Sequence, residues 1–502
     1  MLPYKTIVST VMVVCVMVTS TLHAAEQEEN IEMPSTFSNK VKNISEKKLD
    51  VLDSPIPTML LGSKERFYKA MEDKSSAEIE DYLDGMLDIQ QASKYDPARD
   101  MDAIPMNTES PMFNSWKVIR PQNLNPKREP GLIQMSRYVS HYSSGIKTFA
   151  NAPVALYPED LKAANVEVAI VGIPLDMGSG YRGQRYGPQA MRAIMGASGP
   201  DMNTMVNPSE ELVIADYGDI AVDNMSTELT LGHVREQVAD IARTGAIPFI
   251  VGGDHSLEYP DVAGLADVHG KGSFGVVHFD AHYDAGHNRP HYMTHGQPVY
   301  RTVKEGHVKP ENYIQVGLRG PWPGPEGFEW MRNNGMRYHT MAEIEKKGWK
   351  TVMETAIKEA REGTEKLFIS FDVDVIDPAF VPGTGTPVPG GLTMREAIPI
   401  VRALCSESDM VGFEIVELDP LMDPTYRSAL NANFVMHACL TGVAMRKKGI
   451  TDGFYLSDLT TEHHQPEAGI KAKKEGLNEE VDFNYAKQKQ KQKQKQKQKQ
   501  KQ

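Results

Sequence analysis

From residue 166 onward, short apolar stretches rich in Val and Ile alternate with longer amphipathic stretches. Short, near-continuous apolar stretches are typical of strands buried on both faces, whereas the longer amphipathic stretches are typical of helices. Their alternation predicts a parallel α/β sheet covered by helices on both sides. We expect strands at Val166–Ile173, Glu211–Ala215, Ile247–Val251, Phe274–Phe279, Tyr313–Gly317, Met336–His339, Lys366–Phe371 and Met410–Val416. We expect helices at Leu229–Ala242, Leu257–Val268, Glu343–Ala360, Met394–Leu404 and Tyr426–Arg446.

Carboxylates and imidazoles follow several of these expected strands. Three segments carry them: Gly-Gly-Asp-His255-Ser, Asp280-Ala-His282-Tyr-Asp284 and Asp372-Val-Asp374. In parallel sheets the ligands bind beyond the carboxyl ends of the strands, and all three segments fall on that edge. A fourth strand, Met410–Val416, brings Glu417 to the same edge.

Each segment alone has an ordinary explanation, because such residues also occur at solvated strand ends, in turns that enter helices and in loop mouths. Together they predict a two-metal hydrolase, since buried carboxylates and imidazoles need a counter-charge that divalent cations supply. Four carboxylates with two histidines favour Mn²⁺, with Ni²⁺ as an alternative, over an all-cysteine zinc site. His278 precedes Asp280 by two residues and could share its face, but packing or indirect support is the preferred interpretation; Asp254 is expected to support its neighbour.

The three segments, with the sequence Asp377-Pro-Ala-Phe-Val-Pro-Gly-Thr-Gly-Thr-Pro387, resemble the signature segments of the ureohydrolases, the family of arginases and agmatinases. Val171–Pro174 and Arg185–Arg192 resemble that family's first strand and following helix, and the likeness spans about residues 144–449. It implies a three-layer α/β/α domain with an eight-stranded parallel sheet. It also implies a homotrimer or homohexamer.

The resemblance also implies roles for individual residues. One metal would be held by His255, Asp280, Asp284 and Asp372; the other would be held by His282 and Asp374, with Asp280 and Asp372 bridging. Two neighbouring cations lower the pKa of a water between them, which provides hydroxide at neutral pH. Glu417 matches the carboxylate that anchors the guanidinium, His295 matches the histidine that shuttles protons to the departing amine, and Thr386 matches a hydroxyl of the guanidinium site.

Three features favour agmatine, hydrolysed to putrescine and urea, as the substrate. Arginases follow the metal-binding Asp with Asn, but Asp284 is followed by Ala285; they also carry acidic residues where this chain has Gly320-Pro-Trp322-Pro. Ser144–Phe149 resembles an element of agmatinases. Guanidinobutyrate, guanidine and arginine remain alternatives, and the Trp322 loop could narrow the pocket.

The chain of 502 residues is longer than one such domain, and the surplus lies at both ends. Residues 1–25 have the layout of a secretory signal peptide, which predicts a secreted or periplasmic protein; a miscalled start before a cytoplasmic enzyme is the alternative. Residues 26–143 are expected to form a partly disordered extension, 450–486 a C-terminal extension, and 487–502 a disordered Lys-Gln repeat. Beyond the signal only Cys405 and Cys439 remain, and both are expected to be core thiols without a disulfide.

The net charge of the chain limits which classes of binding partner are expected. The formal charge is −13, and about −21 without the eight lysines of the tail. An acidic body suits a small cationic guanidino substrate and argues against nucleic acid.

Two rival functions remain open at this point. A non-catalytic exported metal-binding protein would need the ligands but neither His295 nor Glu417, and both are present. A deacetylase-like enzyme would share the sheet but use one zinc, which the six-ligand set disfavours.

Overall fold

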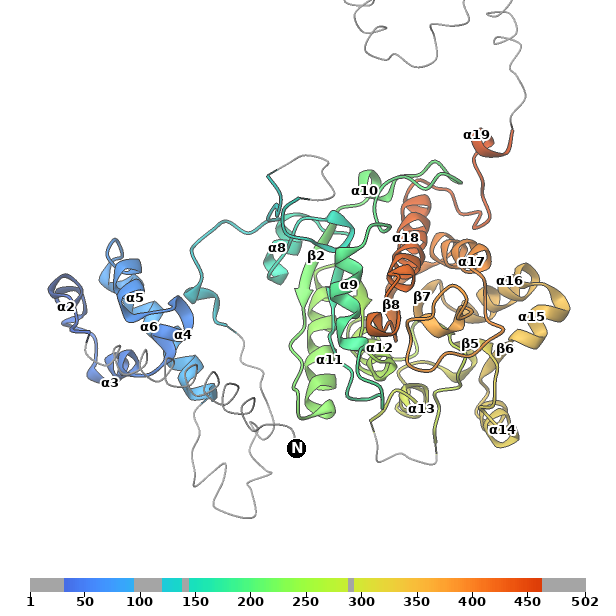
Figure 1. Cartoon of the computed structure of the whole chain (residues 1–502), viewed down its shortest axis with the longest axis horizontal. Helices are drawn as coiled ribbons and strands as arrows, with labels where there is room; N and C mark the ends of the chain where they lie inside the picture. Colours follow the sequence, from blue (N-terminus) through green and yellow to red (C-terminus); the bar gives the residue numbers. More distant parts are fainter. Residues whose placement is uncertain (1–30, 94–119, 138–143, 288–292, 463–502) are drawn as a thin grey trace, which may run out of the picture.

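The computed structural model describes residues 31–93, 120–137, 144–287 and 293–462 (Figure 1). Its central feature is an eight-stranded sheet in the order β2-β1-β3-β8-β7-β4-β5-β6, in which every neighbouring pair is parallel. The predicted eight-stranded parallel sheet is therefore confirmed. The strands are β1 (Val168–Gly172), β2 (Ile214–Asp219), β3 (Ile247–Val251), β4 (Gly275–Phe279), β5 (Tyr313–Leu318), β6 (Arg337–Thr340), β7 (Lys366–Asp372) and β8 (Asp409–Val416).

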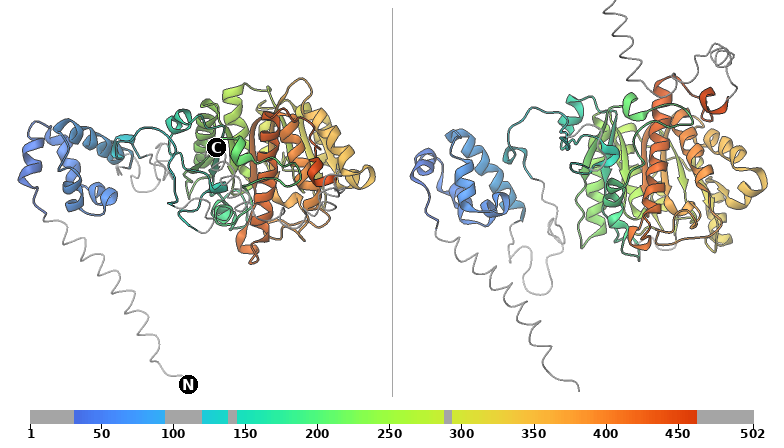
Figure 2. Two further views of the ribbon diagram at one scale, coloured as in Figure 1. Left: turned by 90° about the horizontal axis from the view of Figure 1, so that it is seen from above. Right: turned by 45° about the horizontal axis from the view of Figure 1, so that its top comes forward.

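Helices cover both faces of the sheet and divide the apolar core into two layers (Figure 2). One layer packs under α9 (Gly187–Ala193), α16 (Trp349–Ala360), α17 (Met394–Glu407) and α18 (Arg427–Lys447). The other packs under α8 (Pro158–Ala163), α11 (Thr227–Arg243), α12 (Glu258–His269), α13 (Pro298–Lys304) and α14 (Pro325–Asn333). Because both faces are buried, the inner strands are mostly apolar, which is the pattern seen in the sequence.

The expected helix Glu343–Ala360 is two helices. Gly348 lies between α15 (Met341–Lys347) and α16 with a φ of 82°, a left-handed conformation that glycine adopts without strain. Periodicity alone did not reveal the break, because apolar positions continue at helical spacing on both sides of the glycine.

Cys405 and Cys439 form a disulfide, so the expectation of two separate core thiols was wrong. Cys405 lies on α17 and Cys439 on α18, both side chains are fully buried, and their Cα atoms are 5.3 Å apart. The sequence placed each cysteine on an apolar helix face but did not show that these two faces oppose each other.

Residues 35–93 form a small helical unit with its own apolar core. Its principal helices are α2 (Ser35–Val41), α4 (Ile56–Leu61), α5 (Lys64–Ala70) and α6 (Ser76–Ser93). Phe37, Phe67 and Leu83 are buried in its centre. The expected signal peptide and the Lys-Gln repeat lie outside the described residues. Within the described part of the chain, no helix combines the length and hydropathy needed to cross a membrane.

Candidate active site

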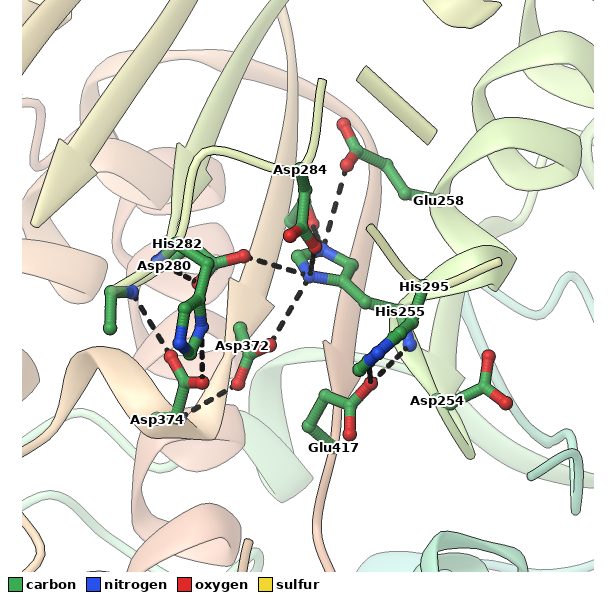
Figure 3. Close-up of polar contacts among 12 residues, drawn as sticks. Asp254, His255, Glu258, Asp280, His282, Asp284, His295, Asp372, Asp374 and Glu417 are labelled. Atoms are coloured by element: carbon green, nitrogen blue, oxygen red, sulfur yellow. Dashed lines mark hydrogen bonds and ion pairs between the residues drawn. The ribbon is translucent and has the colours of Figure 1, made fainter. Parts of the chain in front are cut away.

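Four neighbouring strands in the middle of the sheet, β3, β8, β7 and β4, deliver the polar residues singled out in the sequence. His255 follows β3, Glu417 follows β8, Asp372 ends β7 and Asp280 follows β4. Since parallel strands end at one edge, these side chains converge there, as Figure 3 shows. The structure thus brings together residues up to 162 positions apart in the chain.

The first potential metal-binding group surrounds His255. Its Nδ1 lies 3.0 Å from Oδ2 of Asp280, 3.2 Å from Oδ2 of Asp284 and 3.2 Å from Oδ2 of Asp372 (Figure 3). His255 and Asp280 are fully buried, and Asp284 and Asp372 nearly so. The backbone φ of Asp284 is 45°, an unusual value for a non-glycine residue that aims this carboxylate back toward the group.

The second group centres on His282. Its Nδ1 lies 2.9 Å from Oδ2 of Asp374 and 3.3 Å from Oδ1 of Asp280. Asp280 therefore contributes one oxygen to each group, as a ligand shared by two cations would. Asp372 turns its Oδ1 to the backbone N–H of Asp374 at 2.8 Å, and its bridging role stays a prediction.

The electrostatics of the two groups suit divalent cations. Burial, followed by the charge of Asp280, raises the pKa of Asp284 to about 6. Burial and the charges of Asp374 and Asp280 likewise raise the pKa of Asp372. Nδ1 of His255 and Oδ2 of Asp280 are buried without a hydrogen-bond partner. The carboxylates lie close together, and some of their potential ligand atoms have no hydrogen-bond partner. A pair of divalent cations would supply the positive charge that this arrangement needs.

A buried network supports the metal-binding side chains from beneath. Glu258 Oε2 accepts a hydrogen bond from Nδ1 of His278 at 2.9 Å, while Nε2 of His278 lies 3.2 Å from Oδ2 of Asp280. The His278 ring stacks on His255 with centroids 4.7 Å apart, and Nε2 of His255 lies 2.8 Å from Oγ of Ser370. His255, Glu258 and His278 also lie close enough together to hold an ion, so the supporting role of His278 stays a prediction.

Glu258 was missed by sequence reasoning because it falls in the first turn of an apolar helix. Its signal was a carboxylate three residues after His255, in a position that the helix buries completely. Buried carboxylates around a metal site are expected, because residues outside the ligands orient the ligand side chains.

The residues that the sequence assigned to the substrate lie beside the two groups. Glu417 accepts hydrogen bonds on Oε1 from the backbone N–H of His255 at 2.8 Å and from Nδ1 of His295 at 3.0 Å. Burial alone would lower the pKa of His295, but the charge of Glu417 outweighs it and raises this pKa to about 10. Thr386 donates from Oγ1 to Oδ2 of Asp374 at 3.3 Å. His295 can therefore carry a proton at neutral pH next to the ligand groups.

Asp254 does not join either metal-binding group. Its Oδ2 accepts the backbone N–H groups of Gly178 and Ser179 at 2.8 and 3.1 Å, and its Oδ1 accepts the N–H of Ser256 at 3.1 Å. It holds the loop after β1 against the loop after β3, which is the supporting role expected for it.

A cavity of about 500 Å³ opens over these residues. His282, Asp284 and Asp372 lie on its floor, with His295, Thr386 and Trp322 around it. Among the described lining residues there is no Lys or Arg. Trp322 packs edge-on against Tyr283, with ring centroids 4.9 Å apart, and it faces Gly296, where an added Cβ would lie 3.8 Å from the indole ring.

Comparison with known proteins gives a consistent result. The model of the arginase family matches residues 166–441. A guanidinobutyrase from Pseudomonas aeruginosa is 35% identical over 310 residues, which cover 60% of this chain and 94% of that protein. A mitochondrial agmatinase from Gallus gallus is 35% identical over 295 residues, covering 57% of this chain and 84% of that one. The structure of a proclavaminate amidino hydrolase from Streptomyces clavuligerus is similar with a TM-score of 0.55 and 30% identity, over 61% of this chain and all of that one.

Proposed function

This chain belongs to the arginase family of guanidino-compound hydrolases, and we propose that it hydrolyses agmatine to putrescine and urea with two Mn²⁺ ions. The proposal of a hydrolase rests on one observation, namely that Glu417 and His295 converge on the two ligand groups (Figure 3). A protein that only bound metals would have no need of this pair. Ni²⁺ accepts the same ligands and stays an alternative.

The residues divide the chemistry among them. The six ligands would be His255, Asp280, Asp284 and Asp372 for one ion and His282 and Asp374, with Asp280 and Asp372 shared, for the other. When bound, such a pair of cations supplies a hydroxide nucleophile at neutral pH. Glu417 offers a buried negative charge to the guanidinium, and protonated His295 can deliver a proton to the departing amine.

The tail of the substrate is the part on which relatives differ. A carboxylate tail, as in guanidinobutyrate, would need a cation other than His295, and the described cavity lining contains no Lys or Arg. The ammonium of agmatine would instead contact the indole ring of Trp322, since ammonium groups are attracted to indole rings. Guanidine, guanidinobutyrate and arginine stay alternative substrates.

Urea release from the metal-loaded enzyme tests the proposal with a panel of agmatine, guanidine, guanidinobutyrate and arginine. We expect the highest kcat/KM for agmatine. Glu417→Gln should retain its metals but slow turnover by at least about a hundredfold, because a charged hydrogen-bond partner of a buried cation is lost. Turnover by Glu417→Gln at the wild-type rate would contradict the assigned anchoring role, and higher kcat/KM for another compound would reassign the substrate.

We also propose that the protein is exported and assembles into a homotrimer or homohexamer. The signal-like pattern of residues 1–25 and the Cys405–Cys439 disulfide support export, since disulfides persist in oxidising compartments. Assembly is supported by exposed apolar side chains around the start of α18: Leu421, Met422, Tyr426 and Phe434. Cell fractionation with sequencing of the mature N-terminus, and light scattering of the purified enzyme, would test the two proposals.

A further inference from the structure

Glu417 receives three hydrogen bonds from the protein itself. Besides the two donors on Oε1, its Oε2 accepts from the side-chain amide of Gln184 at 2.9 Å. A carboxylate has about four lone-pair positions, so these donors leave a single position, on Oε2, for a substrate. Glu417 can therefore accept one hydrogen bond from a guanidinium, through Oε2, and cannot form the two parallel hydrogen bonds of a two-pronged pair.

Gln184 is built into the site rather than lying at its rim. It begins the short helix η4 (Gln184–Tyr186) in the segment after β1, and its side chain is fully buried. An added Cβ on Gly385 would lie 2.8 Å from its Nε2, so this glycine leaves the space that the amide occupies. Gln184 thus links Glu417 to the loop that carries Thr386.

Two arginines flank this glutamine but do not reach Glu417. Arg185 makes a two-pronged pair with Asp176, at 2.6 Å from Nε and 2.8 Å from Nη2. Arg182 donates from Nη1 to the backbone carbonyl of the same residue at 2.8 Å. Asp176 is itself buried and pairs with both arginines, whose side chains stay partly exposed to solvent. Among these three residues, Gln184 is therefore the one that donates to Glu417, and its amide is uncharged.

The backbone at Glu417 explains why such a donor is needed. Its φ is 64°, a left-handed conformation that persists in a non-glycine residue only where the surroundings fix it. The backbone N–H of Glu417 donates to the carbonyl of Gly253 at 2.8 Å, which holds the main chain. The hydrogen bond from Gln184 fixes the far end of the side chain.

We infer that Gln184 is a positioning residue for the substrate: its neutral amide orients Oε2 of Glu417 without adding a second cation beside His295, while Asp176 pairs with the two neighbouring arginines. This inference rests on the proposed function. It adds a requirement that metal ligands and anchor alone do not impose, namely that the side-chain donor on Oε2 of Glu417 be uncharged.

Two substitutions separate this role from a merely structural one. Gln184→Met keeps the length of the side chain but removes the donor, so Oε2 of Glu417 loses the hydrogen bond that orients it; KM should rise at least about tenfold with kcat changed less. Gln184→Lys keeps a donor and satisfies the buried carboxylate, but its ammonium competes with the guanidinium. Its KM should rise further than that of the methionine variant, although its unfolding midpoint stays near that of the wild type.

Asn433→Leu provides a matched control. Its fully buried amide donates to the carbonyls of Met191 and Ile194 on the α9 side, away from the cavity. The control should lose stability as Gln184→Met does, with KM unchanged. All variants should retain the metal content of the wild type.

Three results would overturn the inference. Wild-type KM in Gln184→Met, or wild-type KM restored by Gln184→Lys, would reduce Gln184 to a structural donor and leave the proposed function standing. Absence of urea release by the wild-type enzyme from any guanidino compound would instead remove the proposed function, and this inference with it.

Discussion

Glu258→Gln should weaken metal binding without unfolding the protein. Glu258 is fully buried and accepts from Nδ1 of His278 at 2.9 Å, and the other nitrogen of that ring lies 3.2 Å from the shared ligand Asp280. The substitution keeps the size of the side chain but removes its charge. A hydrogen bond to a charged group contributes about 1.5–3 kcal/mol, which corresponds to about 10- to 100-fold in affinity. Losses of this size are typical when the partner of a metal-binding histidine network is removed.

The assay is retention of Mn²⁺ against a competing chelator, followed by elemental analysis of the protein. Glu343→Gln is the matched control, since Glu343 contacts Nδ1 of His339 at the same 2.9 Å but lies far from the cavity. We expect weaker retention in Glu258→Gln and wild-type retention in the control. If Glu258→Gln held Mn²⁺ as tightly as the wild type, the supporting role of the network would be refuted.

Three further outcomes are expected. Asp280→Ala should lose both metals rather than one, because Asp280 belongs to both ligand groups; elemental analysis showing two metals per chain would contradict this. His295→Asn should keep both metals but change the shape of the pH–rate profile of urea release, because the proton donor beside Glu417 is removed; an unchanged profile would exclude that role. Burial alone would raise the pKa of Asp423, but hydrogen bonds from Ser428 and Thr425 outweigh it and lower the pKa to about 2. This carboxylate therefore stabilises the fold by about 2 kcal/mol above pH 4, and the stabilisation should disappear as the pH falls toward 2. In Asp423→Asn, denaturant unfolding should show a smaller acid-dependent loss; an equal loss would refute the assignment.

The strands and the convergence of the ligands could be predicted from the sequence because each depends on local pattern. Val, Ile and Phe in short runs mark buried parallel strands, and Asp280 or Asp372 directly after such a run must lie at the carboxyl edge. Which strands neighbour each other is not local. The sequence could not show that β8, last in the chain, lies between β3 and β7 and sets Glu417 beside His255.

The supporting residues were missed for the same physical reason. Gln184 and Glu258 have ordinary sequence settings, each at the start of a helix, in η4 and in α12. Their importance comes from tertiary contacts with Glu417, 233 residues away, and with His278, 20 residues away. The disulfide likewise depends on how α17 meets α18, which periodicity does not specify.

The position of β8 also bears on how the protein folds. β2, β1 and β3 form one part of the sheet and β7, β4, β5 and β6 form another, and β8 alone joins them. Until β8 has been synthesised and inserted, β3 and β7 each present an unpaired edge, a state prone to association with other chains. His255 belongs to the first part and Asp280, His282 and Asp372 to the second. Cations added during refolding would therefore bridge the two parts and favour closure of the sheet around its last strand.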